Sequence, residues 1–132
     1  KDSVVLLWLL CDAIGLARAR KVYTFTFSEA EPFPELEHFI KDITHRSGVD
    51  LHVLPCKSHR EGLKEVAGRG VQAVLLGTRQ TDPDGRGLSY FTPTSPGWPK
   101  MVRVCPLLDW DYHDIWAYIA AHEVPCCSLY SR

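Results

Sequence analysis

The sequence lacks the cysteine spacing that indicates a disulfide framework or a metal knuckle. Its 132 residues include five cysteines, an odd number, and no two of them form a C-x-x-C pair. Disulfide scaffolds and zinc ribbons are therefore excluded as the basis of the fold. The adjacent residues Cys126 and Cys127 could bind a soft metal, but without further ligands a structural role is the stronger interpretation, and no metal site is predicted. Free thiols fit a reducing compartment, so we expect a cytoplasmic protein, with a mitochondrial isoform as the alternative.

Runs of charge and long apolar runs are also missing. Fifteen Lys and Arg oppose sixteen Asp and Glu, which leaves a formal charge of -1 and no signal for binding DNA or a membrane surface. The longest apolar run, residues 4–17, is interrupted by Asp12 and Gly15 and is too short to span a bilayer. It also lacks the basic leader and cleavage site of a signal peptide. We therefore expect neither nucleic acid nor membrane as a partner, and an anionic small molecule must be bound by local groups.

What the sequence does contain is enough for one hydrophobic core, because 45% of the residues are apolar and 23% are charged. Apolar periodicity predicts helices over 3–18, 32–48, 58–70 and 109–123, and strands over 21–27, 49–55, 71–77 and 102–108. Alternating strands and helices imply right-handed crossovers, and hence an α/β fold: a three-layer α/β/α sandwich with a mainly parallel sheet. The almost wholly apolar strand 71–77 is predicted to be buried on both faces.

Polar residues follow these strands at their carboxyl ends, where ligands bind in such sheets. Arg79 and Asp82 come just after strand 71–77, in "GTRQTDPDG". Arginine offers a planar fork of donors to a phosphate, and a carboxylate accepts hydrogen bonds from a ligand. A surface ion pair beside a turn is the structural alternative, because Asp-Pro and Asp-Gly are common turn formers. Glu29 is a further candidate, although an acidic residue near a helix start usually serves the helix dipole.

A long connection follows, over residues 78–100. It is rich in Gly, Pro, Ser and Thr, yet it carries Tyr90, Phe91 and Trp98. A connection of this length in a compact domain is usually functional or disordered, and three aromatic side chains favour function. Trp98, between Gly97 and Pro99, is either the rigid wall of a ring pocket or an anchor that packs on the core.

Four motifs, in order along the chain, resemble a known family. They are "GTRQTDP" at 77–83, "TSPGWP" at 94–99, "CPLLDWDYHDIWAYI" at 105–119 and "VPCCSLY" at 124–130. Together they resemble the eukaryotic-type FAD synthase (FMN adenylyltransferase) family, in the PAPS-reductase-like group of ATP pyrophosphatases. The resemblance covers most of the chain and implies an adenine nucleotide α-hydrolase-like fold.

The resemblance also implies that residues 1–132 are one PAPS-reductase-like domain cut at both ends. In that family a loop similar to N-G-G-K-D precedes the first helix, and only Lys1 and Asp2 match it here. The family's closing segment continues beyond Tyr130, whereas this chain stops at Arg132. We therefore expect that the first strand, the phosphate loop and the C-terminal segment are lacking, that the fragment alone is inactive, and that the parent chain can carry an additional domain.

The implied reaction is adenylyl transfer from ATP to FMN, which gives FAD and pyrophosphate with the help of Mg²⁺. Asp2, Arg79 and Asp82 are the implied catalytic residues. Arg79, Asp82 and Trp98 would form the flavin side of the site. Substrate-binding positions implied by the motifs are Lys1, Asp2, Ser3, Arg79, Asp82, Ser95 and Trp98.

Two other functions remain open at this point. One is another enzyme of the same group, a sulfonucleotide reductase or a sulfurylase-like subunit, although "PCCSLY" lacks the Glu-Cys-Gly context that reductases use. The other is a non-catalytic nucleotide- or flavin-binding module. Ser95 supports the module, because many members of the family carry an acidic residue at this position and a hydroxyl brings no charge.

Overall fold

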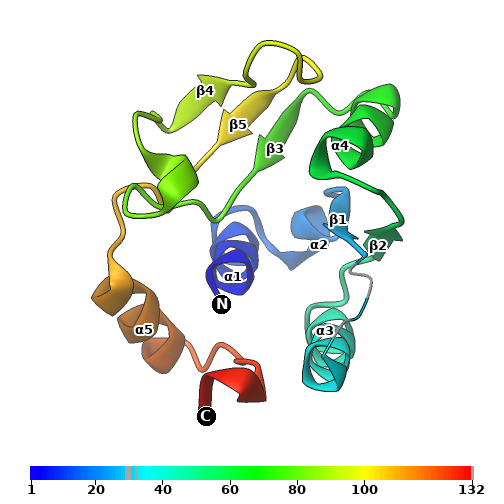
Figure 1. The fold of residues 1–132 in the computed structure, drawn as a ribbon. Coiled ribbons are helices and arrows are strands. Elements are labelled where there is room, and N and C mark those ends of the chain that lie inside the picture. The colour runs from blue at the N-terminus through cyan, green and yellow to red at the C-terminus, as the bar shows by residue number, and fades with distance from the viewer. Residues whose placement is uncertain (29–30, 32, 132) are drawn as a thin grey trace.

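Ten regular elements and two short 3₁₀ turns make up the computed structural model, which describes residues 1–28, 31 and 33–131 (Figure 1). The candidate Glu29 lies outside these residues. The helices are α1 (Asp2–Ile14), α2 (Leu16–Ala19), α3 (Pro34–Ser47), α4 (His59–Gly68) and α5 (Tyr112–Ala121). The strands are β1 (Thr24–Phe27), β2 (Leu51–Leu54), β3 (Ala73–Leu75), β4 (Phe91–Pro93) and β5 (Val102–Val104), and the 3₁₀ turns are η1 (Pro83–Gly85) and η2 (Ser128–Ser131).

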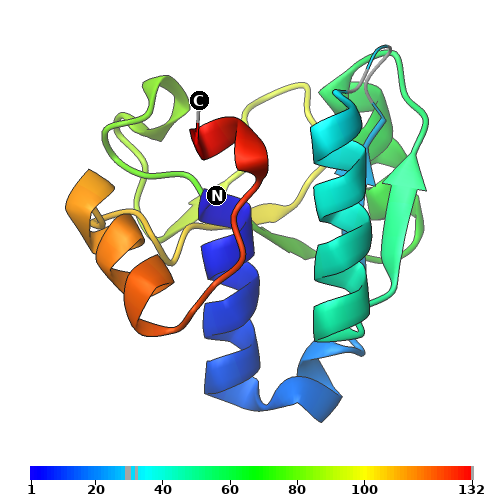
Figure 2. The ribbon, with the colours of Figure 1, turned by 90° about the horizontal axis from the view of Figure 1, so that it is seen from below.

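The strands form two hydrogen-bonded groups. In the first, β1 pairs with β2 in parallel; in the second, β5 lies between β3, which is parallel to it, and β4, which is antiparallel. The helices α1, α3 and α5 lie side by side below the strands, and α4 lies on the other side (Figures 1 and 2). The predicted three-layer arrangement with mainly parallel pairing is therefore confirmed, with β4 as an antiparallel strand that the sequence did not predict.

Strand β3 departs from the prediction that it is buried on both faces. Ala73 and Leu75 are exposed and Val74 is half-buried. The reason is tertiary, because β3 is hydrogen-bonded to β5 along one edge, and within the described residues its other edge has no strand partner. An apolar strand buries its side chains only when other elements cover both of its faces. The apolar character of residues 71–77 therefore predicted more burial than β3 has.

The first predicted helix is interrupted in the structure. Residues 3–18 do not form one helix, because Gly15 with φ of 82° separates α1 from α2. Glycine adopts this positive φ without a Cβ penalty, so the chain changes direction there. Near the other end of the described chain, η2 forms over Ser128–Ser131. Ser58 caps α4, because its hydroxyl accepts a hydrogen bond from the backbone N–H of Glu61 at 3.2 Å.

Two hydrophobic clusters hold the layers together. The first joins α1 to α5 and consists of Val5, Leu6, Leu107, Ile115, Ile119 and Val124. The second packs α4 against the strands and consists of Leu54, Val66 and Met101. Each cluster removes apolar surface from water on one side of the sheet, which positions the strand ends between the helices. In the described part of the chain, no helix combines the length and the apolar character needed to cross a membrane.

Helix α5 begins with a capping box, which gives a test of the fold. The Asp111 carboxylate accepts hydrogen bonds from the backbone N–H groups of Asp114 at 2.9 Å and His113 at 2.6 Å, and the Asp114 carboxylate accepts one from the Asp111 N–H. These bonds, with that from Asp114 the strongest contribution, hold the pKa of Asp111 below its ordinary value.

We expect Asp111→Ala to lower the melting temperature by a few degrees at pH 7, because two N–H groups lose their acceptor. The folded pKa is below the unfolded one, so the contribution is complete above the unfolded pKa and is lost as the pH falls through the folded pKa. The difference between the variant and the parent should thus shrink in acid. Asp111→Asn, which keeps an acceptor, is the control. Equal melting temperatures for Asp111→Ala and the parent at pH 7 would contradict the prediction.

Candidate active site

The carboxyl end of β3 meets the start of α1. A Cβ built on Gly77 would lie 3.0 Å from the Asp2 carbonyl carbon and 3.1 Å from the Ser3 nitrogen, so any larger residue would force the two segments apart. The first turn of a helix has free N–H groups and the positive end of its dipole, which favours anions. The packing of Gly77 therefore places the residues after β3 beside an anion-attracting helix start.

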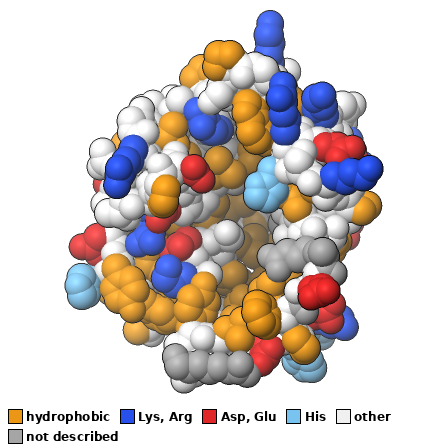
Figure 3. All heavy atoms as spheres, viewed as in Figure 1, with side chains coloured by type: hydrophobic (Ala, Val, Ile, Leu, Met, Phe, Trp, Pro, Cys, Tyr) orange, Lys and Arg blue, Asp and Glu red, His pale blue; other side chains and the backbone are white. Residues whose placement is uncertain are grey.

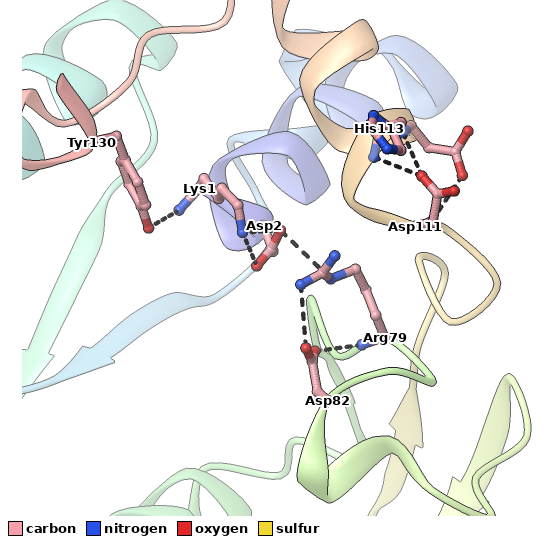
Figure 4. Close-up of polar contacts among 8 residues, drawn as sticks. Lys1, Asp2, Arg79, Asp82, Asp111, His113 and Tyr130 are labelled. Carbon is pink, nitrogen blue, oxygen red and sulfur yellow. Dashed lines mark hydrogen bonds and ion pairs between the residues drawn. The ribbon is translucent and has the colours of Figure 1, made fainter.

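Four side chains form a line of alternating charge at this point (Figure 4). The Lys1 ammonium lies 3.2 Å from Asp2 Oδ2, and Arg79 Nε lies 3.8 Å from Asp2 Oδ1. The same guanidinium donates from Nη2 to Asp82 Oδ1 at 3.3 Å. Sequence reasoning predicted all four of these residues as site residues, and the structure brings them together. Ser3 is exposed next to them in the first turn of α1.

Arg79 is held by a turn as well as by its ion pairs. Asp82 Oδ2 accepts a hydrogen bond from the Arg79 backbone N–H at 2.8 Å, and Gln80 N–H donates to the Leu108 carbonyl at 2.8 Å. A Cβ on Gly85 would overlap the Arg79 carbonyl oxygen, so only glycine allows η1 to close on this residue. Asp82 thus both forms the turn and positions the guanidinium, as the structural alternative of an ion pair beside a turn predicts.

The guanidinium of Arg79 still has unused donors. Its side chain is 12% exposed, and its Nε has no hydrogen-bond partner among the described residues, with Asp2 beyond hydrogen-bonding distance. A buried donor without an acceptor costs about 1–3 kcal/mol. An incoming phosphate oxygen would supply that acceptor. On the other side of Asp2, the Tyr130 hydroxyl accepts a hydrogen bond from the Lys1 backbone nitrogen at 3.2 Å, which brings η2 to the margin of the site.

Ser95 and Trp98 lie in a neighbouring pocket of about 480 Å³ along the face of the sheet. Val74, Leu76 and Thr78 line it from β3 and the residues that follow, and Asp84 reaches it from η1. The residues that line it do not include Arg79 and Asp82, so the charged line and the pocket are adjacent but separate. Trp98 is 38% exposed and borders the pocket instead of packing in the core.

Among the polar residues of this pocket that sequence reasoning missed are its histidine and its arginine, His59 and Arg103. A signal for Arg103 was present in the sequence, because "VRV" places a charge between two valines of a predicted strand. Only the pairing of β5 with both neighbours decides which face that side chain takes. His59 begins α4 and stacks on Phe27, with ring centroids 5.0 Å apart.

The described residues contain no group of three His, Cys, Asp or Glu side chains that could hold a metal ion. Mg²⁺ does not require such a cage, because it usually takes one or two carboxylates together with substrate phosphates. The carboxylate of Asp2, 24% exposed and at the helix start, fits that requirement as a single protein ligand.

Comparison with known proteins relates this chain to a reductase domain and to proteins named FAD synthase or FMN adenylyltransferase. Residues 56–132 match the model of the phosphoadenosine phosphosulfate reductase domain. The chain is 35% identical over its full length to a probable FAD synthase of Caenorhabditis briggsae, of which it covers 26%. It superposes on the crystal structure of Candida glabrata FMN adenylyltransferase with a TM-score of 0.87 and 28% identity, over 98% of this chain and 46% of that one.

A second structure of the Candida glabrata enzyme, in complex with FMN and the ATP analogue AMPCPP, superposes with a TM-score of 0.74 at 28% identity. It aligns with 81% of this chain and 39% of that one. The chain thus spans about a quarter of the worm protein and less than half of the yeast enzyme. The reductase domain model matches more than half of the chain, and the matched residues include the motifs that contain Arg79 and Trp98. The chain therefore belongs to the phosphoadenosine phosphosulfate reductase domain family, and the proteins it resembles include FAD synthases.

Proposed function

We propose that the protein of which this chain forms part transfers the adenylyl group of ATP to FMN, producing FAD and pyrophosphate. The observation that carries the proposal is the convergence of Lys1 and Arg79 on Asp2 at the start of α1, beside a pocket bordered by Trp98. Cations at a helix start suit a polyphosphate, and an apolar pocket with an aromatic wall suits a flat ring. The Candida glabrata enzyme crystallised with FMN and an ATP analogue supports the same pair of substrates.

In this reaction a phosphate oxygen of FMN attacks the α-phosphorus of ATP. A new P–O bond forms as the bond to the bridging oxygen of the β-phosphate breaks, and pyrophosphate leaves. Such a transfer depends on position and on charge stabilisation more than on a protein nucleophile. Lys1 and Arg79 would stabilise the negative charge on the phosphates, with Asp82 positioning the Arg79 guanidinium. Asp2 is the residue that would hold Mg²⁺, and the bound ion would offset the charge of the leaving pyrophosphate.

The flavin ring would occupy the pocket that runs from Thr78 to Trp98. Thr78 is adjacent to Arg79, so a ligand with its phosphate at the charged line can extend its ring along β3. Aromatic side chains stack on flat rings at centroid distances of about 4.5–7 Å. Ser95 lies on the same pocket, and its hydroxyl would offer a neutral hydrogen bond to the ring.

The nucleotide half of the site would be completed by a strand that the described residues do not contain. Between β1 and β3 lies a groove of about 340 Å³, and α1 forms its floor with Leu6, Leu7 and Leu10. Figure 3 shows this side of the molecule hollowed near its centre, with hydrophobic side chains in the hollow. A strand parallel to β3 in this groove would end beside Lys1, because Gly77 contacts the start of α1. A short loop from that strand to α1 would then surround the phosphates with N–H groups.

The five cysteines are free thiols, and Cys105 and Cys127 are buried. Free thiols persist where glutathione keeps them reduced. This supports a cytoplasmic enzyme, with a mitochondrial isoform as the alternative.

The first test concerns Asp82 in the full-length polypeptide. We expect Asp82→Ala to lower the rate of FAD formation from FMN and ATP by at least about tenfold, because Arg79 loses its positioning carboxylate. The melting temperature should also fall by a few degrees, because the Arg79 backbone N–H loses its acceptor. Asp42→Ala is the matched control, because it breaks the exposed Arg46–Asp42 ion pair of α3, outside the charged line and the ring pocket. Unchanged kinetics would leave Asp82 with a turn-forming role alone.

The second test concerns the ring pocket. FMN should quench the fluorescence of Trp98, and Trp98→Leu should weaken FMN binding by about 1 kcal/mol or more while ATP affinity stays nearly constant. Trp98→Phe keeps an aromatic face and should retain most of the affinity. Titrations with FMN and ATP separately measure both effects. If Trp98→Leu binds FMN as the parent does, or loses ATP affinity instead, the ring does not occupy this pocket.

The third test concerns the groove between β1 and β3. Residues 1–132 alone should form FAD at a negligible rate, and the backbone amides of residues 24–27 and 73–75 should exchange hydrogen faster than in the full-length polypeptide. The amides of α5 serve as the internal control, because α1 already covers that helix. If residues 1–132 alone form FAD at a rate near that of the full-length polypeptide, the site needs no further strand and this part of the proposal is wrong.

A further inference from the structure

An arginine occupies the centre of the sheet beneath the ring pocket. Arg103 lies in the middle strand β5, opposite Val74 of β3 on one side and Thr92 of β4 on the other. It lines the same pocket as Trp98. Val74 and Met101, which belong to the hydrophobic cluster under α4, line this pocket together with the polar residues His59 and Asp84. A cation therefore faces a pocket whose walls are mainly hydrocarbon.

The donors of this guanidinium are largely unused. Nη2 donates to the Pro93 carbonyl at 3.0 Å, and Nε is buried with no hydrogen-bond partner in the part of the chain that the structure describes. No carboxylate in that part forms an ion pair with it. A guanidinium has five N–H donors in one plane, and each buried donor without an acceptor is unfavourable. A hydrophobic residue would serve the sheet better, so the arginine is suited to an acceptor that arrives with a ligand.

The position of Arg103 decides which part of the ligand it meets. Val74, Leu76 and Thr78 lie on one side of the pocket, and Arg103 is beside Val74. Strand β3 ends at Leu75, and Thr78, which precedes Arg79, follows Val74 by four residues, a span of at most roughly 13 Å. With a phosphate at Thr78 and Arg79, the ring end of the ligand would extend along β3 toward Val74 and Arg103.

We propose that Arg103 determines the specificity of the pocket by binding the carbonyl-bearing edge of the flavin ring while Trp98 covers the ring face. The inference rests on the proposed function and extends it to a residue outside the charged line. Each carbonyl oxygen of a flavin's pyrimidine ring lies in one plane beside an acceptor nitrogen, N1 or N5, while the N3–H between the carbonyls is a donor; a planar fork of donors matches either oxygen–nitrogen pair. A ring without those acceptors would leave the guanidinium unpaired and would be rejected.

The test uses the full-length polypeptide with Arg103→Met and, as the matched loss of one positive charge, Arg46→Met on the exposed face of α3. FMN, riboflavin and ATP are titrated separately. Riboflavin has the same ring as FMN but no phosphate. We expect Arg103→Met to weaken FMN and riboflavin by the same factor, at least about tenfold, and to leave ATP unchanged. Arg103→Lys should recover only part of the affinity, because it has no planar fork.

Thermal stability separates this role from a structural one. Arg103→Met removes an unpaired buried donor and fills the space with an apolar side chain, so its melting temperature should equal or exceed that of the parent. A lower melting temperature with unchanged flavin affinity would assign Arg103 to the sheet and overturn the inference. If Arg103→Met weakens the binding of FMN but leaves the binding of riboflavin unchanged, Arg103 contacts the FMN phosphate, and this outcome also overturns the inference. If the parent binds ATP but neither flavin, the proposed function itself fails.

Discussion

The candidate site depends on the close approach of the β3 carboxyl end to the start of α1 at Gly77. A Cβ at this position would lie 3.0 Å from the Asp2 carbonyl carbon and 3.1 Å from the Ser3 nitrogen, so glycine favours the close approach of the helix start to the strand end that precedes Arg79. The positive end of the helix dipole, the Lys1 ammonium and the Arg79 guanidinium then surround one carboxylate. Asp82 pairs with the same guanidinium, so the side-chain charges balance, and it is the helix start together with the unused donors of Arg79 that suits the site to an anion.

A single strand connects the charged line to the ring pocket. Val74, Leu76 and Thr78 line the pocket, and Arg79 follows Thr78 directly. A ligand that has a phosphate at one end and a flat ring at the other can therefore be held along β3 without any movement of the backbone. Different elements form the two halves of the candidate site. A turn holds Arg79 at the phosphate end, whereas the β4–β5 connection and α4 enclose the ring end.

Both arginines of the candidate site have a buried nitrogen without a hydrogen-bond partner in the described residues. Four side-chain atoms of this kind occur in the described residues, and two of them are the Nε atoms of Arg79 and Arg103. The other two, Tyr23 Oη and Trp116 Nε1, lie outside both parts of the candidate site. Buried groups without partners weaken a fold, and such exceptions to local consistency are expected at functional sites. Both arginines thus have donors available for a ligand, at a cost to stability that the hydrophobic clusters must offset.

The sequence by itself predicted most of the helices, the three-layer α/β arrangement and the polar residues that follow β3. Apolar periodicity and capping residues such as Ser58 act within a few residues, and the motif containing Arg79 and Asp82 follows directly from strand β3. The tertiary structure alone decided the exposure of β3, the antiparallel strand β4 and the face on which Arg103 lies. Each of these depends on which strands become neighbours, and hydrogen bonding between segments distant in sequence leaves no local pattern. Strand pairing also decided that Trp98 borders the pocket while Arg79 lies outside it. The connection between β4 and β5, which carries Trp98, reaches the face of β3 only because β5 pairs with β3.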